Sequence, residues 1–196
     1  MRIVAAFAGV GKTYFCGLYP QALDFVVMPF KYENYSQIAN CCAEGESIKA
    51  HESLELRYDW RDFYYQALMD TYHRYPGEIL VIPTDRSILR RLEQDTLPYT
   101  VVYPSRSLKE EYCQRYLARG NTDSFLDVFI GGWDMWMESI RDNNGSHIEL
   151  QSGEFLSDVI QLPNSSSGII EDKDNYIACI VRELLLDKNS LDTIYY

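Results

Sequence analysis

The fold is decided by residues 2–18, which read RIVAAFAGVGKTYFCGL. The apolar run at 2–7 predicts a buried strand, and a short helix is expected over 11–18, where Pro20 stops it. Gly9 and Gly11 lie in the turn between the two. A strand, a glycine-rich turn and a helix in this order predict the first unit of a parallel α/β sheet.

Short apolar runs alternate with stretches of helical period along the rest of the chain. Further strands are predicted at 23–28, which Pro29 closes, and at 79–82, 99–103 and 147–150. Helices are predicted at 32–42, 53–75, 86–93, 108–119, 124–141, 155–160 and 169–186. Apolar strands that alternate with helices predict a doubly wound α/β domain, a parallel sheet of about five strands with helices on both faces.

Ligands of such sheets bind beyond the carboxyl ends of the strands. After the first strand, residues 6–13 read AFAGVGKT and match the phosphate-binding pattern GxxxxGK[ST], with alanine at the first position. In this segment, the glycine loop, backbone N–H groups are expected to bind phosphate oxygens. The lysine would reach the β- and γ-phosphates, and the threonine hydroxyl would bind Mg²⁺. The predicted binding residues are Ala8, Gly9, Val10, Gly11, Lys12 and Thr13. The alternative is a plain strand-to-helix turn with a surface lysine.

A second metal residue is predicted at Asp85, just beyond the strand at 79–82. In phosphate-loop enzymes an acid at the end of a neighbouring strand holds Mg²⁺ through water, so Asp85 is expected to act together with Thr13. The other interpretation, compatible with the first, is that Asp85 caps the helix that begins near Arg86.

A basic island lies at 86–119, where seven Lys and Arg stand against four Asp and Glu in an acidic chain. Arg115 and Arg119 project from one side of the helix expected there, and Arg106 stands at its start. One interpretation is a solvated helix face on which Glu111 pairs with Arg115. The other is a set of arginines for a small anionic ligand. With the glycine loop, this segment resembles the lid region of small phosphate-loop kinases, the adenylate, shikimate and gluconate kinase group.

This resemblance implies ATP and Mg²⁺ as cofactors and a strand order of 2-3-1-4-5. It implies that Arg106, Arg115 and Arg119 close on the transferring phosphoryl group and act with Lys12 as catalytic residues. It also implies one domain over residues 1–196, with a helical acceptor-side insert, a lid and an acidic helical extension. These segments are expected at about 31–75, 104–122 and 161–196.

The phosphate acceptor stays open. In the insert, Arg57 and Arg61 either hold an acceptor phosphate or form a helix-surface pair. Asp24 and Glu33 flank the second strand, where the resembled kinases often keep an acid near the acceptor. Residues 84–87 read TDRS, whereas those kinases usually carry Asp-Gly-x-Pro-Arg or a similar segment.

The predicted function is therefore an ATP-binding kinase that transfers the γ-phosphate of Mg-ATP to a nucleoside, a nucleoside monophosphate or another small acceptor. The alternative is a nucleotide-binding regulatory or signalling module with slow hydrolysis or none. The departure at 84–87 and the acidic C-terminal segment favour this alternative.

Composition narrows the choice of partners. The chain has 196 residues, of which 46% are apolar, and a net charge of −11. This acidity argues against an extended nucleic acid as partner, and no run approaches the ~20 apolar residues of a membrane helix. Five cysteines without CxxC spacing predict a reduced, cytoplasmic setting. A nucleotide and a small acceptor are the expected partners, and the oligomeric state is left open.

Overall fold

A computed structural model describes residues 2–41, 53–162 and 170–192 of the chain. Within it the chain forms two compact units. The first comprises Met1–Asp24 and Gly77–Gly168, and the second comprises Phe25–Pro76 and Ile169–Tyr196. Parts of the helices predicted at 32–42 and 169–186 lie outside the described residues.

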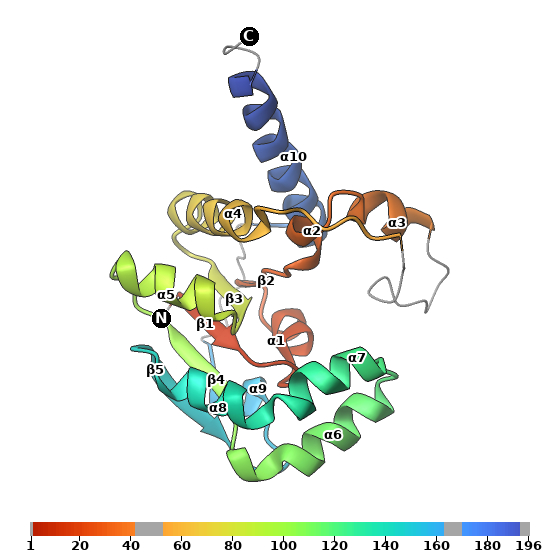
Figure 1. The fold of residues 1–196 in the computed structure, drawn as a ribbon. Helices are drawn as coiled ribbons and strands as arrows, with labels where there is room; N and C mark the ends of the chain where they lie inside the picture. Colours follow the sequence, from red (N-terminus) through yellow and green to blue (C-terminus); the bar gives the residue numbers. More distant parts are fainter. Residues whose placement is uncertain (1, 42–52, 163–169, 193–196) are drawn as a thin grey trace. The chain divides into compact units, whose positions relative to one another are not determined.

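The first unit contains a sheet of five parallel strands, drawn as arrows in Figure 1. The strands are β1 Ile3–Ala6, β2 Ala22–Asp24, β3 Ile79–Pro83, β4 Thr100–Pro104 and β5 Ser146–Leu150. Their order across the sheet is β2-β3-β1-β4-β5. The predicted fold class and strand order are both confirmed.

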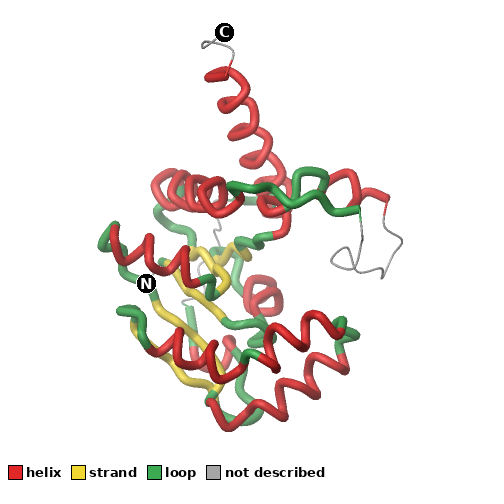
Figure 2. Tube along the Cα trace, viewed as in Figure 1, coloured by secondary structure: helices red, strands yellow, loops and turns green. Residues whose placement is uncertain are grey.

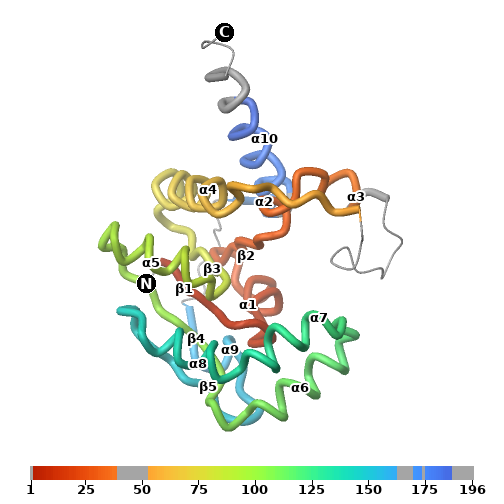
Figure 3. Tube along the Cα trace, viewed as in Figure 1, coloured from red at the N-terminus to blue at the C-terminus, as the bar shows by residue number. Residues whose placement is uncertain are grey.

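Strand β1 lies in the middle of the sheet and carries the glycine loop at its carboxyl end. Its four residues are fully buried, as expected for a parallel strand that is covered on both faces. Val4 is paired with Val81 of β3 on one side and with Thr100 of β4 on the other. The colours of Figure 3 show how far apart in sequence these neighbours are.

The helices of the first unit follow its strands along the chain, and all but the last of them lie between two strands. They are α1 Lys12–Leu18, α5 Arg86–Gln94, α6 Lys109–Ala118, α7 Asp123–Leu126, α8 Trp133–Arg141 and α9 Leu156–Val159, with a 3-10 turn at Arg106–Leu108. Right-handed crossovers place α1 on one face of the sheet and α5 and α8 on the other, because the chain moves in opposite directions from β1 to β2 and from β3 to β5. Figures 1 and 2 show α5 and α8 in front of the strands.

The single helix predicted at 124–141 is wrong. The structure has α7, then a π-helical segment at Asp127–Gly131, and then α8. The consecutive glycines at 131 and 132 weaken helix propensity at this point, and the Trp136 indole N–H donates to the Val128 carbonyl at 2.9 Å. This bond stabilises the wider turn, because it gives the Val128 carbonyl oxygen a partner.

The second unit consists of α2 Met28–Lys31, α3 Tyr35–Cys41, α4 Trp60–Arg74 and α10 Lys173–Asp192. Its core is aromatic: Phe25 stacks on Phe30, and the Tyr64 ring meets both rings edge-on. Helices α4 and α10 pack together, and the hydroxyls of Thr71 and Tyr176 are 2.8 Å apart.

Two boundaries near this unit differ from the prediction. The strand expected at 23–28 ends at Asp24, and Pro29 lies in the first turn of α2, where its missing N–H costs nothing. The helix expected at 53–75 begins only at Trp60. Residues 55–57 are extended instead, because Glu33 N–H donates to Glu55 O at 2.9 Å and Arg57 N–H donates to Lys31 O at 2.8 Å.

Among the residues that the structure describes, no helix is both long and apolar enough to span a membrane. Within the same described residues, Cys113 and Cys179 form no disulfide bond.

Candidate functional site

The glycine loop leaves β1 with a fixed backbone path. Phe7 N–H still donates to Val102 O of β4 at 2.9 Å, and the Val10 carbonyl accepts from Leu156 N–H at 2.9 Å. Gly9, between these two anchored residues, has a φ of +82°, and Gly11, just after them, has a φ of +89°. Both values lie in the left-handed region that glycine adopts without strain. Gly11 precedes α1, and no side chain caps the first amides of that helix.

Lys12 turns back over the loop. Its ammonium donates to the carbonyl oxygens of Ala6 at 3.1 Å and Phe7 at 3.0 Å, the last residue of β1 and the first beyond it. The side chain is half-buried. A positive charge is therefore held at the carboxyl end of the central strand, where ligands of this fold class bind.

Thr13 contacts an acid that was not among the predicted metal residues. Its hydroxyl donates to Oδ2 of Asp24, the last residue of β2, at 2.9 Å. A hydroxyl and a carboxylate are hard oxygen ligands of the type that Mg²⁺ prefers. No group of three or more His, Cys, Asp or Glu that could hold a metal occurs among the described residues. The pair therefore fits a cation that takes its other ligands from phosphate and water.

Asp85, the predicted second metal residue, is the N-cap of α5. Its Oδ1 accepts from the backbone N–H groups of Ser87 at 2.9 Å and Ile88 at 3.2 Å. The capping interpretation is thus realised in the geometry, and the acid in contact with Thr13 is Asp24.

Two tyrosines of α6 pack against the glycine loop. Tyr116 donates its hydroxyl to Ala8 O at 2.9 Å, and a Cβ added to Gly9 would lie 2.8 Å from Cε1 of Tyr116 and 3.4 Å from Cε1 of Tyr112. Both side chains are fully buried. Burial raises the pKa of Tyr112 to about 12 and also raises the pKa of Tyr116, so both hydroxyls are neutral at pH 7.

The three predicted lid arginines do not gather at one place. Arg106 forms an ion pair with Asp134 at 2.6 Å, and Arg119 is exposed at the end of α6. Arg115 lies beside the glycine loop: its guanidinium is 4.3 Å from the centre of the Phe155 ring, and Cδ1 of that ring is 3.4 Å from where a Cβ of Gly11 would be.

The wall behind the loop is aromatic. The Phe7 ring makes edge-on contacts with Phe129, Trp133 and Trp136. Trp133 is fully buried and donates its indole N–H to Arg106 O at 2.9 Å. Phe7 and Trp133 belong to the core, whereas Phe129 and Trp136 are half-buried. The Trp133 bond attaches α8 to the segment after β4.

In the second unit, Arg57 has a structural role. It is 7% exposed, donates from Nε to Phe30 O at 3.1 Å and lies 4.6 Å from the centre of the Phe63 ring. Arg61 is exposed and lies 4.3 Å from the centre of the Trp60 ring. The pair predicted for an acceptor phosphate is therefore divided between the core and the surface of this unit.

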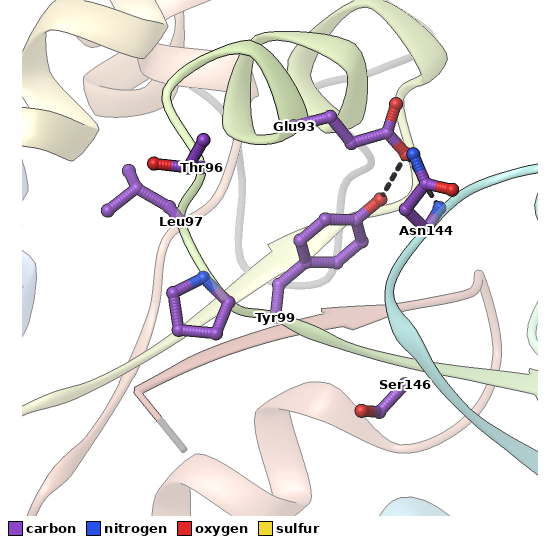
Figure 4. A pocket seen from close by; sticks show the side chains of 7 residues that line it. Glu93, Thr96, Leu97, Tyr99, Asn144 and Ser146 are labelled. Atoms are coloured by element: carbon purple, nitrogen blue, oxygen red, sulfur yellow. Dashed lines mark hydrogen bonds between the residues drawn. The ribbon is translucent and has the colours of Figure 1, made fainter.

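A pocket of about 270 Å³ lies near the amino ends of β4 and β5, whereas the glycine loop lies at the carboxyl end of β1 (Figure 4). Its lining residues are Glu93, Thr96, Leu97, Pro98, Tyr99, Asn144 and Ser146. The Glu93 carboxylate accepts from Asn144 N–H at 2.8 Å and from the Tyr99 hydroxyl at 2.7 Å. These hydrogen bonds lower the pKa of Glu93. Through them, Glu93 joins the end of α5 to the start of β5.

Comparison with known proteins adds no family. No protein-family model matches the chain, and no curated protein matches it significantly. The functional argument therefore rests on the glycine loop and on the side chains around it.

The sequence pattern found the loop itself and singled out Asp24, but as an acid near the acceptor and not as a partner of Thr13. It missed Tyr116 and Phe155. An acid at the end of the second strand was a usable signal for Asp24. The tyrosines of α6 are spaced i, i+4, and this spacing indicates a common face but does not say what that face covers. No sequence signal pointed to Phe155.

Proposed function

We propose that the chain is an ATP-dependent kinase that uses the glycine loop to hold the phosphates of Mg-ATP. The observation that carries the proposal is the arrangement of two left-handed glycines, the Lys12 ammonium and the Thr13–Asp24 pair around the carboxyl end of β1. Phosphoryl transfer requires positioning and charge neutralisation more than covalent chemistry by the protein, and these groups supply both.

In the proposed reaction, the backbone N–H groups of the loop bind the phosphate oxygens and Lys12 binds the β- and γ-phosphates. Thr13 and Asp24 would hold Mg²⁺, which neutralises negative charge on the phosphates when bound. Arg115 would be the arginine that contacts the phosphates, because it packs on the Phe155 ring, which lies beside Gly11. The acceptor hydroxyl oxygen would form a bond to the γ-phosphorus while the bond between the γ-phosphorus and the β,γ-bridging oxygen breaks. ADP is the leaving group, and the hydroxyl proton passes to water.

We propose a nucleoside, a nucleoside monophosphate or a similarly small molecule as the acceptor. One observation favours the alternative of a nucleotide-binding regulatory module: Arg106 is engaged with Asp134, and Arg119 lies exposed at the end of α6. In a kinase we would expect more than one arginine near the transferred phosphoryl group, whereas here only Arg115 lies beside the loop.

The test is a panel of nucleosides, nucleoside monophosphates and small hydroxylated metabolites incubated with Mg-ATP and the purified chain. We expect ADP release that depends on one acceptor class and falls about 100-fold in Lys12→Ala. Lys109→Ala is the matched control, because Lys109 is an exposed lysine of the same unit.

Two results would decide against the kinase. ADP release that no acceptor stimulates, but that Lys12→Ala abolishes, would favour the regulatory module. The absence of any difference between Lys12→Ala and the wild type would refute both functions.

A further inference from the structure

Glu111 of α6 is the centre of a hydrogen-bond network between two parts of the first unit. Its Oε2 accepts from the Ser152 hydroxyl at 2.7 Å, and its Oε1 accepts from Gly153 N–H at 3.3 Å and from Arg115 Nη2 at 2.5 Å. A helix-surface ion pair would need only the last of these bonds. The other two join α6 to the turn that follows β5.

The Arg115 guanidinium lies close to two aromatic rings. The centre of the Tyr112 ring is 4.8 Å away and that of the Phe155 ring is 4.3 Å away. With the Glu111 bond, these contacts leave the side chain only 17% exposed. These contacts hold the Arg115 guanidinium next to the Phe155 ring.

One donor of this guanidinium is unused. Nη1 of Arg115 is buried and has no hydrogen-bond partner among the described residues. A buried N–H of a charged group without an acceptor is unfavourable, so a ligand oxygen at this place would be stabilised. Tyr112 is fully buried whereas Phe155 is 40% exposed, so a ligand would approach from the Phe155 side, where Gly11 of the glycine loop lies.

We infer that Glu111 is a positioning residue that presets Arg115 for a nucleotide phosphate and couples it to the turn after β5. This inference rests on the proposed function. The hydrogen bond from Ser152, followed by the backbone bond from Gly153 and the pairing with Arg115, lowers the pKa of Glu111. The carboxylate is therefore ionised at neutral pH, and its bond to the guanidinium is charge-assisted.

Contacts that do not involve Glu111 also hold α6 in place. The helix is independently attached to the loop by the Tyr116 hydroxyl, and Tyr112 packs against Trp133. Glu110, its neighbour in the chain, is an exposed glutamate that accepts a hydrogen bond from Gln114 at 2.9 Å. Glu110→Gln is therefore the matched control for Glu111→Gln.

The experiment measures Mg-ATP binding by titration calorimetry for the wild type, Glu111→Gln, Glu110→Gln, Arg115→Ala and the Glu111→Gln/Arg115→Ala double variant. We expect Glu111→Gln to weaken binding about tenfold, because a neutral hydrogen bond replaces a charge-assisted one. Glu110→Gln should bind like the wild type. In the Arg115→Ala background the Glu111 substitution should have no further effect, because its action runs through Arg115.

Three results would overturn the inference, and they differ in what else they overturn. If Glu111→Gln and Glu110→Gln both bound Mg-ATP as tightly as the wild type, Glu111 would have no positioning role. The proposed function would still stand. If Glu111→Gln lowered the Mg-ATP affinity equally in the wild-type and the Arg115→Ala background, Glu111 would have a general structural role. No Mg-ATP binding by the wild type would refute the proposed function and this inference together. Thermal midpoints of all variants check that each is folded.

Discussion

Gly9 lies where the glycine loop passes closest to α6. Its φ of +82° is a conformation that L side chains rarely adopt, and an added Cβ would lie 2.8 Å from Cε1 of Tyr116. That ring cannot move away easily, because it is fully buried and its hydroxyl is bonded to Ala8 O. Both the backbone and the packing at this position therefore require glycine.

For Gly9→Ala we expect the free energy of unfolding to fall by about 2 kcal/mol, from the combined strain and overlap. Gly17→Ala is the control, because Gly17 lies within α1 and an added Cβ would meet nothing within 4 Å. Alanine there should leave stability unchanged or raise it by up to about 1 kcal/mol. Denaturant unfolding measures both, and equal stability of the two variants would contradict the described loop geometry.

At the scale of single residues, the sequence predicted what a linear pattern contains. The spacing of Gly9, Gly11 and Lys12 after an apolar strand was enough to locate the loop. The residues around it could not be predicted in the same way, because the contacts of Asp24 and Tyr116 with the loop join positions 11 and 108 residues apart.

Two acids near the carboxyl ends of β2 and β3 have different roles. Asp24 ends β2 and accepts from the Thr13 hydroxyl, whereas Asp85 follows β3 and caps α5 through two backbone N–H groups. Both follow parallel strands at the same edge of the sheet. Their hydrogen-bond partners distinguish Asp24, the candidate metal ligand, from Asp85, the helix cap.

These roles predict opposite phenotypes for the two acids. Asp24→Asn should raise the Mg²⁺ concentration needed for half-maximal ATP binding at least about tenfold, with little change in stability. Asp85→Ala should lower the free energy of unfolding by about 1 kcal/mol, or about 3 °C in the thermal midpoint, and leave the Mg²⁺ requirement unchanged. Mg²⁺ titrations and thermal melts on both variants give the answer. The reverse pattern would support Asp85 as the metal residue in place of Asp24.

Element positions were predicted better than element ends. All five strands were found, because buried parallel strands are short apolar runs between turns. The errors have tertiary causes. The extended stretch at 55–57 is fixed by hydrogen bonds to Lys31 and Glu33, and the π-helical segment by the Trp136 indole.

At the scale of the whole molecule, the fold class followed from the alternation of strands and helices, and the strand order followed from the resemblance to phosphate-loop kinases. The grouping of 25–76 with 169–196 into a second compact unit could not be predicted. It depends on contacts between α4 and α10, such as that of Thr71 with Tyr176, and these residues are 105 positions apart. The net charge of −11 is compatible with a single nucleotide, because the proposed site uses few cations, chiefly Lys12 and Arg115.

The central claim is that the glycine loop binds Mg-ATP through Lys12, and calorimetric titration of the whole chain with Mg-ATP tests it most directly. We expect one site per chain in the wild type and in Lys109→Ala, with equal affinity. In Lys12→Ala the affinity should fall roughly 10- to 100-fold, because hydrogen bonds from a charged donor to the phosphates are lost. No binding by the wild type, or binding by Lys12→Ala as tight as that of Lys109→Ala, would contradict the claim.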